Sequence, residues 1–381
     1  MRKKRLIHLP TTVGGNAQTL SRFLSGSDLA SESWAIQQNY LAYSADYFIA
    51  KTNRPRWIRE IRRVFALRYV LLCDAVFFNF GQTLFSPVYA KDGGFFHTWM
   101  RNALNAVFSC LQRIELFILK LRGVPIFVQY QGDDARQGDY SLKNFSTSIA
   151  QEVDDFYYAP KSDAQKRKQI SLICGYADRV YALNPDLLRV LPEKAQFLPY
   201  SHIDLDVWKP QELPTNFTLL RIGHAPTHRQ AKGTKYILEA LESLGKRGFI
   251  FELVLVEGVS HDQARNAYES IDVLVDQLLA GWYGGLAVEL MALGKPVIAY
   301  IREEDLEFIP TQMRAELPIV RAGPDSIESV LESILLMGRE EFKDLGLRSR
   351  AFVEQWHSPI ITAERIKRDL FATFERKNRS A

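Results

Sequence analysis

Two basic residues stand three positions apart in a loop that should follow a β-strand. Arg229 and Lys232 belong to the segment Gly223–Thr234, which comes after a predicted strand at residues 217–222 and before a helical pattern. Arginine offers a planar fork to an anion and lysine offers a point charge, so the two together can grip a diphosphate. Thr234 can cap the helix that follows. The alternative is a solvated basic loop that binds no ligand.

A glycine-rich segment further along the chain, residues 281–294, also has the composition of an anion site. Gly284 and Gly285 let the backbone approach a ligand closely. The helix predicted from Leu286 would aim its first N–H groups and the positive end of its dipole at that ligand. Glu289 lies one turn into this helix, where a carboxylate can accept two hydrogen bonds from a cis-diol such as a ribose. Its alternative role is that of a charge partner for the helix dipole.

The elements that must hold these loops alternate between strands and helices. Predicted strands occupy residues 6–9, 75–80, 125–130, 179–182, 217–222, 251–256, 273–275 and 296–300. This alternation predicts parallel sheets with crossover helices, and such sheets bind ligands at the carboxyl ends of their strands. Prolines near residues 199–215 mark a boundary between two halves. We therefore expect an N-terminal domain at 1–205, a C-terminal domain at 206–355 and a final crossover helix at 356–381.

The composition is that of a globular protein and excludes several other classes. Of the 381 residues, 47% are hydrophobic and 24% are charged, which excludes a disordered chain, a collagen-like fibre and a disulfide miniprotein. A net charge of +4 is too small for a general nucleic-acid binder. Three scattered cysteines fit neither a metal site nor a disulfide framework and indicate a reducing compartment. The sequence has no apolar stretch of about 18 residues, so no membrane-spanning helix is expected.

The two glycine-containing motifs together resemble the C-terminal domain of retaining, nucleotide-sugar-dependent glycosyltransferases of the GT-B fold, close to family four. In that family an Arg and a Lys bind the donor diphosphate, and a Glu binds the nucleotide ribose. Arg229, Lys232 and Glu289 occupy matching positions. Residues 177–188 and 198–210 resemble the segments that lead from one domain to the other in this family. The resemblance implies an α/β protein with two Rossmann-like domains, a cleft between them, and a C-terminal helix that packs back on the N-terminal domain.

The resemblance also assigns further residues to the site. Donor contacts are expected from Gly14, Gly15, His224, Thr234, Tyr283, Gly284, Gly285 and Leu286, and acceptor contacts from Asn16, Gln131, Asp134 and Arg136. Two positions depart from the family. Gly281 stands where many members carry a second glutamate that faces the donor sugar. Gln131 stands where a His often precedes a Gly, and its amide can bind a sugar hydroxyl but cannot shuttle a proton at neutral pH.

The expected activity is transfer of a sugar from a nucleoside-diphosphate sugar to a glycan or lipid-linked glycan, with retention of configuration, in cell-surface polysaccharide or glycolipid synthesis. The leaving phosphate can accept the acceptor's proton, and Arg229 and Lys232 would stabilise the charge that develops on it. No cofactor or metal is expected, and Asp204 and Asp206 are read as part of a hinge. One alternative is a nucleotide-sugar epimerase of the same fold, which Gly281 disfavours. The other is a catalytically silent, membrane-docked sugar-nucleotide sensor.

The N-terminal third of the chain is basic. Residues 1–128 carry 17 Lys and Arg against 7 Asp and Glu. In Lys51–Arg68, seven basic residues interleave with Trp57, Ile61 and Phe65 at roughly helical spacing, and the segment Phe95–Lys120 adds further aromatic and basic residues. These patterns predict a cytoplasmic protein that docks peripherally on an anionic membrane leaflet. The alternative is that the apolar residues simply face the core of the domain.

Overall fold

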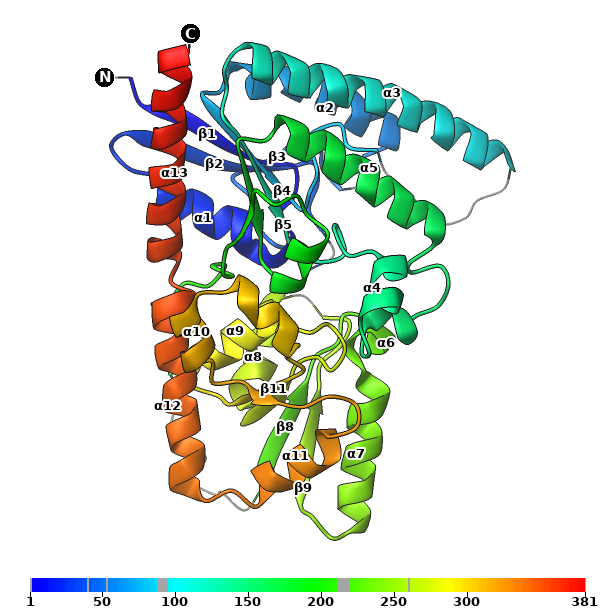
Figure 1. The fold of residues 1–381 in the computed structure, drawn as a ribbon, viewed down its shortest axis with the longest axis vertical. Coiled ribbons are helices and arrows are strands. Elements are labelled where there is room, and N and C mark those ends of the chain that lie inside the picture. The colour runs from blue at the N-terminus through cyan, green and yellow to red at the C-terminus, as the bar shows by residue number, and fades with distance from the viewer. Residues whose placement is uncertain are drawn as a thin grey trace.

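The computed structural model describes most of the chain: residues 2–39, 41–52, 54–87, 95–210, 219–259 and 261–380, without the side chains of 95–101, 261, 262 and 380. Two parallel sheets, each covered by helices on both faces, lie one above the other in Figure 1. The α/β class with two Rossmann-like halves is thereby confirmed.

The N-terminal sheet has seven strands in the order β3-β2-β1-β4-β5-β6-β7, and every neighbouring pair is parallel. Its strands are β1 Lys4–Leu9, β2 Leu29–Ala35, β3 Tyr47–Phe48, β4 Ala75–Asn79, β5 Ile126–Tyr130, β6 Arg179–Ala182 and β7 Ala195–Phe197. In the first of these, Ile7 pairs with Glu32 on one side and with Val76 on the other. Every residue of β4 and β5 is buried, as expected for central strands of a parallel sheet.

The helices of this half are η1 Val13–Gly15, α1 Asn16–Leu24, α2 Arg56–Leu72, α3 Phe95–Leu121, α4 Gly138–Asn144, η2 Ile149–Gln151, α5 Pro160–Tyr176 and η3 Pro185–Arg189. Alternate strand residues serve the two faces of the sheet. Phe77 packs in the same cluster as Leu20 of α1, whereas its neighbour Val76 packs in the cluster that contains Leu116 of α3 and Ile173 of α5. The period of two in a buried strand therefore decides which helix each side chain meets.

The C-terminal sheet has five parallel strands in the order β12-β11-β10-β8-β9. Its strands are β8 Leu220–His224, β9 Phe251–Leu255, β10 Val273–Val275, β11 Val297–Ala299 and β12 Val320–Arg321. Its helices are α6 Arg229–Lys232, α7 Thr234–Lys246, α8 His261–Ser270, α9 Gly285–Ala292, η4 Glu303–Phe308, α10 Thr311–Glu316, α11 Ile327–Leu335 and α12 Arg339–Trp356. One face packs against α7 and α11, and the other packs against α9 and α12.

The last helix, α13 (Pro359–Ser380), leaves the C-terminal half and runs beside α1 of the N-terminal half (Figure 1). Ile366 and Leu370 are fully buried there. Tyr181 of β6 donates a hydrogen bond to Asp369 Oδ2 at 2.7 Å, and Lys367 Nζ lies 2.7 Å from Asp28 Oδ1. The expected return of the C-terminal helix to the N-terminal domain is confirmed.

Most strands predicted from the sequence lie within two residues of their observed bounds, but four strands were missed, three of them only two or three residues long. The predicted strand at 217–222 begins at Leu220, and residues 217 and 218 lie outside the described part. The missed strands are β2, β3, β7 and β12. The sequence of β2 is LASESWA, and its serines are not typical of a buried strand. They are buried because partners in the fold satisfy them: the hydroxyl of Ser31, for example, is 3.1 Å from His8 Nε2.

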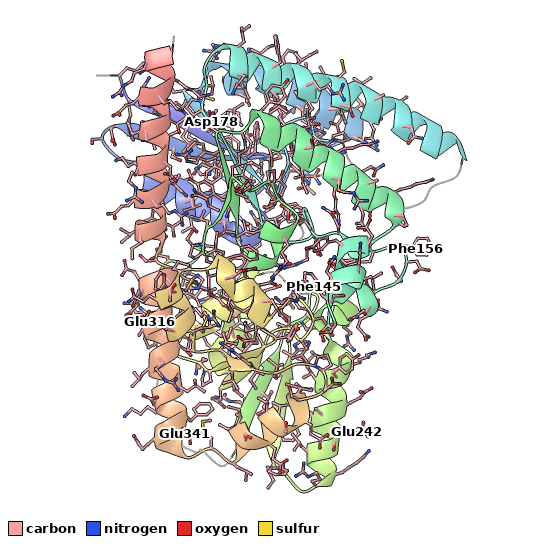
Figure 2. The ribbon with its side chains drawn as sticks, in the orientation of Figure 1. Phe145, Phe156, Asp178, Glu242, Glu316 and Glu341 are labelled. Atoms are coloured by element: carbon pink, nitrogen blue, oxygen red, sulfur yellow. The ribbon has the colours of Figure 1, made fainter. Side chains whose placement is uncertain are left out.

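The two halves touch through side chains as well as through the connecting segment. Phe145, which follows α4, lies at the level where the two halves meet (Figure 2). The guanidinium carbon of Arg302, from the C-terminal half, stands 3.6 Å from the centre of its ring. Tyr236 at the start of α7 donates to Glu152 Oε1 of the N-terminal half at 2.5 Å. The relative position of the halves thus depends on specific contacts.

Candidate functional site

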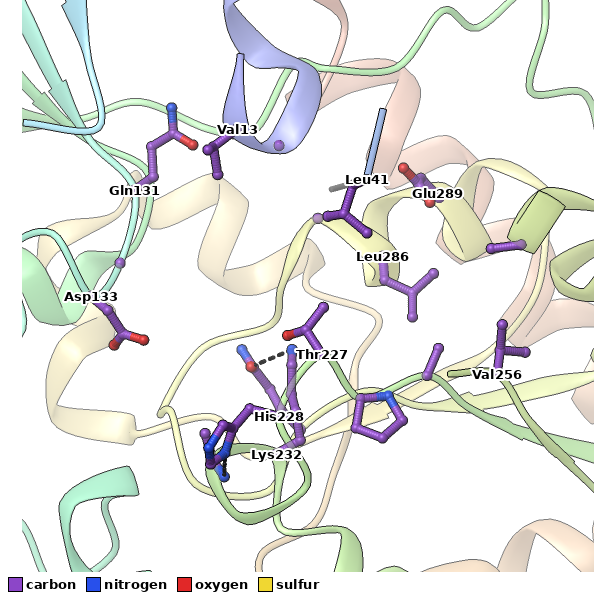
Figure 3. A pocket seen from close by; sticks show the side chains of 18 of the residues that line it. Val13, Leu41, Gln131, Asp133, Thr227, His228, Lys232, Val256, Leu286 and Glu289 are labelled. Atoms are coloured by element: carbon purple, nitrogen blue, oxygen red, sulfur yellow. Dashed lines mark hydrogen bonds between the residues drawn. The ribbon is translucent and has the colours of Figure 1, made fainter. Parts of the chain in front are cut away.

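A cleft of about 660 Å³ lies between the two halves. Loops that follow β1, β4 and β5 line one wall, and loops that follow β8, β9 and β10 line the other. Carboxyl ends of parallel strands are the usual ligand site of such sheets, and here two sheets present theirs to one space. Figure 3 shows Gln131 and Asp133 on the N-terminal wall, and Thr227, Lys232 and Glu289 on the C-terminal wall.

Lys232 supplies a cation to the C-terminal wall. Its Nζ lies 2.7 Å from Gln277 Oε1 and 3.2 Å from Asp276 Oδ1, both just after β10. Asp276 Oδ2 also accepts a hydrogen bond from the backbone N–H of Gly284 at 2.5 Å. These contacts hold the ammonium group close to the start of α9. A diphosphate in the cleft would meet this cation and the positive end of the helix dipole together.

Arg229 stands at the rim rather than beside Lys232. Its side chain is 56% exposed, and its guanidinium donates to both oxygens of Glu257 at 2.8 and 2.5 Å. This bidentate pair raises the pKa of Arg229 and lowers that of Glu257. Glu257 lines the cleft but Arg229 does not. The guanidinium would have to leave Glu257 to reach a diphosphate.

Glu289 faces the cleft from the first turns of α9 and is not alone there. Its Oε1 lies 3.2 Å from Nε2 of His202, a residue of the segment that connects the two sheets. A side chain at Gly285 would come within 3.3 Å of the same imidazole ring, which explains why the helix begins with a glycine. Leu286 lines the cleft beside them (Figure 3).

The carboxylate on the N-terminal wall belongs to Asp133. Its oxygens accept hydrogen bonds from the hydroxyls of Tyr157 and Tyr158, each at 2.5 Å, and its side chain is 38% exposed. Burial between the domains favours the neutral acid, but the Arg136 guanidinium and the two tyrosines outweigh it and hold the pKa of Asp133 below its ordinary value. Gln131 lines the same wall.

Asp134 and Arg136, predicted to bind an acceptor, instead build this loop. Asp134 is turned away from the cleft and accepts the backbone N–H groups of Gln131 and Gly132 at 3.0 and 2.6 Å. Burial raises its pKa to about 6. Arg136 borders the cleft, but its Nε donates to Asp186 at 2.6 Å, so its charge is already paired. Of the two neighbouring aspartates, Asp133 therefore lines the cleft and Asp134 does not.

Four other predicted contacts are buried side chains outside the cleft lining. The ring nitrogens of His224 contact the Val275 carbonyl and the Thr234 hydroxyl, both at 2.8 Å, and burial lowers its pKa to about 4. Tyr283 and Asn16 serve the connecting segment, as described below. In this structure these side chains hold the loops in place, behind the residues that line the cleft.

The four glycines that were predicted to contact the donor also divide into residues that line the cleft and residues that do not. Gly14 and Gly285 line the cleft, whereas Gly15 and Gly284 do not. A side chain at Gly15 would meet the ring of Tyr43 at 3.4 Å, and one at Gly284 would lie 3.4 Å from Lys232 Nζ. Gly15 and Gly284 therefore allow close packing immediately behind the residues that line the cleft.

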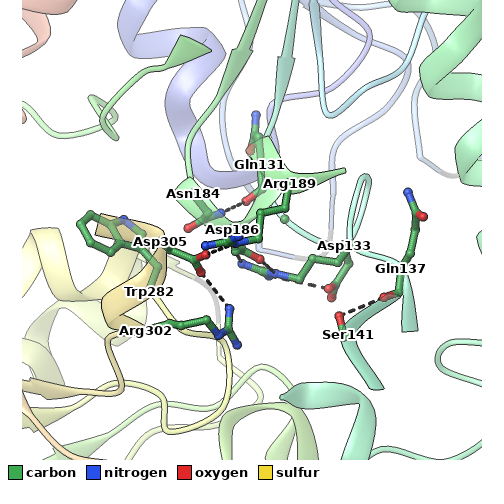
Figure 4. A network of polar contacts seen from close by, with 12 residues as sticks. Gln131, Asp133, Gln137, Ser141, Asn184, Asp186, Arg189, Trp282, Arg302 and Asp305 are labelled. Atoms are coloured by element: carbon green, nitrogen blue, oxygen red, sulfur yellow. Dashed lines mark hydrogen bonds and ion pairs between the residues drawn. The ribbon is translucent and has the colours of Figure 1, made fainter. Parts of the chain in front are cut away.

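Gly281, where a second glutamate was noted as missing, has φ +82° and no room for a side chain. A Cβ there would stand 2.5 Å from Arg302 Nη1. Arg302 in turn donates to Asp305 Oδ2 at 2.9 Å, and Arg189 of the N-terminal half donates to Asp305 Oδ1 at 2.5 Å (Figure 4). The space beside Gly281 is thus occupied by an ion network that joins the two halves.

Two residues of the N-terminal wall have an unusual backbone. Ala42 and Phe80 have φ of 61° and 56°, which only glycine adopts without cost, and within the described ranges no other non-glycine residue has positive φ. Phe80 lines the cleft, and Ala42 stands between the lining residues Leu41 and Tyr43. Such conformations gather at functional sites, where the surrounding structure holds them.

Asp204 and Asp206 lie in the connecting segment. Asp204 accepts from Arg22 Nη2 at 2.5 Å and from the backbone N–H of Asp206 at 3.0 Å. In the described part of the chain, no group of three or more His, Cys, Asp or Glu side chains could hold a metal ion.

Comparison with solved structures identifies the architecture. HepE from Anabaena, solved in complex with UDP-glucose, matches with a TM-score of 0.56 at 11% identity over 97% of this chain and 100% of that chain. WaaG, a glycosyltransferase involved in lipopolysaccharide biosynthesis, matches with a TM-score of 0.55 at 10% identity over 94% and 98%. The chain has the GT-B fold. No protein-family model and no curated protein matches the sequence.

The GT-B fold is not restricted to transferases among these neighbours. A UDP-GlcNAc 2-epimerase from Neisseria meningitidis, bound to UDP-GlcNAc, matches with a TM-score of 0.51 at 14% identity over 98% of this chain and 100% of that one.

Among the ionisable residues that line the cleft, the sequence indicated Lys232 and Glu289 but not Asp133 and His202. The Asp133-Asp134 pair was a visible signal, whereas nothing in the sequence near His202 indicated its contact with Glu289.

Proposed function

We propose that the protein is a retaining glycosyltransferase, similar to family four, that transfers a sugar from a nucleoside-diphosphate sugar to a glycan or a lipid-linked glycan. The observation that carries the proposal is the placement of Lys232 and Glu289 on one wall of an interdomain cleft, with the start of α9 between them. The cation suits a diphosphate and the carboxylate suits the diol of a ribose. The complex of HepE with UDP-glucose supports a nucleotide-sugar ligand.

In the proposed reaction, an acceptor hydroxyl oxygen forms a bond to the anomeric carbon while the bond from that carbon to the diphosphate breaks on the same face. The hydroxyl proton passes to the departing phosphate oxygen, so no side-chain base is needed. Lys232 stabilises the negative charge on the leaving group, which is the main source of catalysis. Asp133, on the opposite wall and ionised at neutral pH, accepts a hydrogen bond from an acceptor hydroxyl and orients it.

A ligand screen tests the donor. The melting temperature of the protein is measured with UDP-, GDP-, ADP- and TDP-sugars, because a ligand that binds only the folded state raises it. We expect one nucleotide class to give a clear shift, and we expect Lys232→Ala to reduce that shift. The same small response to all four classes would contradict the proposal. Binding without transfer to any glycan or lipid acceptor would favour the silent sensor instead.

The alternative reaction, epimerisation of the donor, has one observation in its favour besides the fold. An epimerase moves protons at the sugar, and Asp133 places a carboxylate in the cleft. The two reactions differ in their substrates, because sugar transfer needs an acceptor and epimerisation does not. Incubation of the protein with the nucleotide sugar alone, followed by NMR of the sugar, would show a new epimer only if the protein is an epimerase.

We also propose that the N-terminal half docks on the cytoplasmic face of a membrane whose surface is anionic. Trp57 and Phe65 of α2 are 65% and 63% exposed, while the core side of the same helix is formed by Ala66 and Val70. The alternative, that the apolar residues of this segment face the core, fails for the two aromatic rings. Inserted rings add apolar burial, and each basic residue near an anionic surface contributes about 1 kcal/mol.

Helix α3 extends this surface, with Val107, Ile114, Phe117 and Leu121 exposed. The aromatic residues predicted at 95–99 have side chains outside the described part. No helix in the described ranges is long and apolar enough to cross a bilayer. Association at the surface is therefore the form of membrane contact that we propose.

Vesicle co-sedimentation tests the docking. We expect the protein to pellet with anionic vesicles at low salt and to stay in the supernatant with neutral ones. Trp57→Ala combined with Phe65→Ala should reduce the pelleted fraction several-fold. Ile250→Ala, which removes an equally exposed apolar side chain (73%) from the C-terminal half, is the matched control. Equal recovery with both kinds of vesicle would overturn the docking proposal.

A further inference from the structure

We propose that His202 is a positioning residue for Glu289: it orients the carboxylate that receives the nucleoside diol and ties that orientation to the segment between the domains. The inference rests on the proposed function. His202 lies between β7 and β8, and its side chain is 4% exposed. Its Nε2 is 3.2 Å from Glu289 Oε1, and both residues line the cleft.

The imidazole ring packs against the first residue of α9. A Cβ on Gly285 would stand 3.3 Å from the His202 Cε1 and 3.4 Å from its Nε2, so a side chain there would crowd the ring that contacts Glu289. Gly285, which was expected to contact the ligand, therefore also makes room for this histidine.

The backbone around His202 is fixed from both sides. The Thr19 hydroxyl of α1 donates to the His202 carbonyl at 2.8 Å, and Asn16 Oδ1 accepts the Ser201 N–H at 3.2 Å. Two consecutive residues of the segment are thus held by the first turns of α1. This is the role of Asn16, which was expected to touch the acceptor.

The C-terminal half holds the same segment through a second histidine. His357 Nδ1 donates to the Tyr200 carbonyl at 2.7 Å, and its Nε2 accepts from the Tyr283 hydroxyl at 2.8 Å. Tyr283 belongs to the loop that leads into α9. The loop that ends in the Glu289 helix and the segment that carries His202 are therefore joined by hydrogen bonds, independently of the contact between Glu289 and His202.

A carboxylate that must accept two hydrogen bonds from a diol benefits from a fixed orientation. When the His202 Nε2–H donates to Oε1, rotation of the carboxylate is restricted and the remaining lone pairs keep a defined direction. A hydrogen bond to a charged group is stronger than one between neutral groups. Loss of the donor should therefore weaken nucleotide binding without removing a group that acts on the reacting atoms.

A double-mutant cycle tests the inference. Binding of UDP, or of whichever nucleoside diphosphate gives the largest shift in the ligand screen, is measured by calorimetry. We expect His202→Ala and Glu289→Gln each to raise Kd about tenfold. The double variant should be no more than about threefold weaker than the weaker single variant, because the two residues act as one unit. His202→Gln, which keeps an N–H donor, should restore Kd to within about threefold of the wild type.

Kinetics provide the second measurement, and a neighbouring ion pair provides the control. In sugar transfer, His202→Ala should raise KM for the donor and leave kcat within about threefold. Arg22→Ala breaks an exposed pair with Asp204 on the same segment and should leave Kd unchanged. Additive effects of about a hundredfold in the cycle, or no rescue by glutamine, would overturn the role of His202. Absence of nucleotide binding by the wild type would overturn the proposed function, and this inference with it.

Discussion

The two walls of the cleft are both built from loops that follow parallel strands, but they differ in the charged group that faces the cleft between them. The C-terminal wall presents the ammonium group of Lys232 and the start of α9, whereas the N-terminal wall presents the carboxylate of Asp133 among aromatic side chains. The Lys232 ammonium group suits a leaving group that gains negative charge, and the Asp133 carboxylate suits a neutral hydroxyl that must be oriented. Loops after equivalent strand ends can thus place different charged groups on the two sides of one cleft.

The largest expected effect is on the C-terminal wall, which carries Lys232. Lys232→Ala should lower turnover about a hundredfold or more, because losing one charge partner of the leaving group costs roughly 3 kcal/mol of transition-state stabilisation. Steady-state transfer assays measure it. Lys246→Ala is the control, since that lysine lies at the far end of α7 and pairs with exposed Glu242. Near-normal turnover of the Lys232 variant would show that the walls do not differ as we propose.

On the opposite wall, Asp133→Asn should lower kcat/KM for the acceptor about thirtyfold and leave donor binding unchanged. The amide keeps the size of the side chain but loses the charge that orients a hydroxyl. Transfer assays at saturating donor, together with calorimetry of the bare nucleotide, separate the two effects. A loss of nucleotide affinity equal to the loss of activity would mean that Asp133 belongs to the donor site.

Glu289→Gln should weaken binding of the bare nucleoside diphosphate about tenfold, since a charged acceptor becomes an amide with one acceptor oxygen. Calorimetry is again the measurement, and the melting temperature of the variant is its control for folding. An unchanged affinity would return Glu289 to the role of a charge partner for the dipole of α9.

The last effect concerns stability rather than activity, and it comes from one titrating group behind each wall, with the two groups acting in opposite directions. Burial lowers the pKa of His224 to about 4, so its contribution is present above its ordinary value of 6.5 and is lost as pH falls. Burial raises the pKa of Asp134 to about 6, so its contribution is present below 3.8 and is lost as pH rises. Between pH 4 and 6 each group changes the free energy of unfolding by about 1.4 kcal/mol per pH unit, with opposite sign.

Asp134→Asn removes one of these opposing contributions. The variant should therefore lose stability on acidification more steeply than the wild type, by about 1.4 kcal/mol per pH unit between pH 6 and 4. Urea unfolding at a series of pH values measures the difference, in which the contributions of the other buried groups cancel. Parallel profiles for the two proteins would contradict the burial of a titrating carboxyl at this position.

The sequence predicted the fold and the C-terminal wall better than the N-terminal one, for physical reasons. Lys232 and Glu289 stand at fixed distances from a strand end or a helix start, so local pattern determines where they point. The choice between Asp133 and Asp134 depends on which carboxylate caps its own loop and which meets Tyr157 and Tyr158, some 25 residues away. His202 was missed for the same reason, because its partner is 87 positions further along the chain.

The return of α13 to the N-terminal half means that the first strand and the last helix belong to one folding unit. Lys4 Nζ lies 5.1 Å from the ring centre of Phe374, so β1 and the last turns of α13 are close together. A fragment that stops after the first sheet would expose to water the face that Ile366 and Leu370 cover. By contrast, a circular permutant that joins the old ends through a short linker and begins within the C-terminal half would keep this packing, because proximity rather than chain order brings the helix and the sheet together.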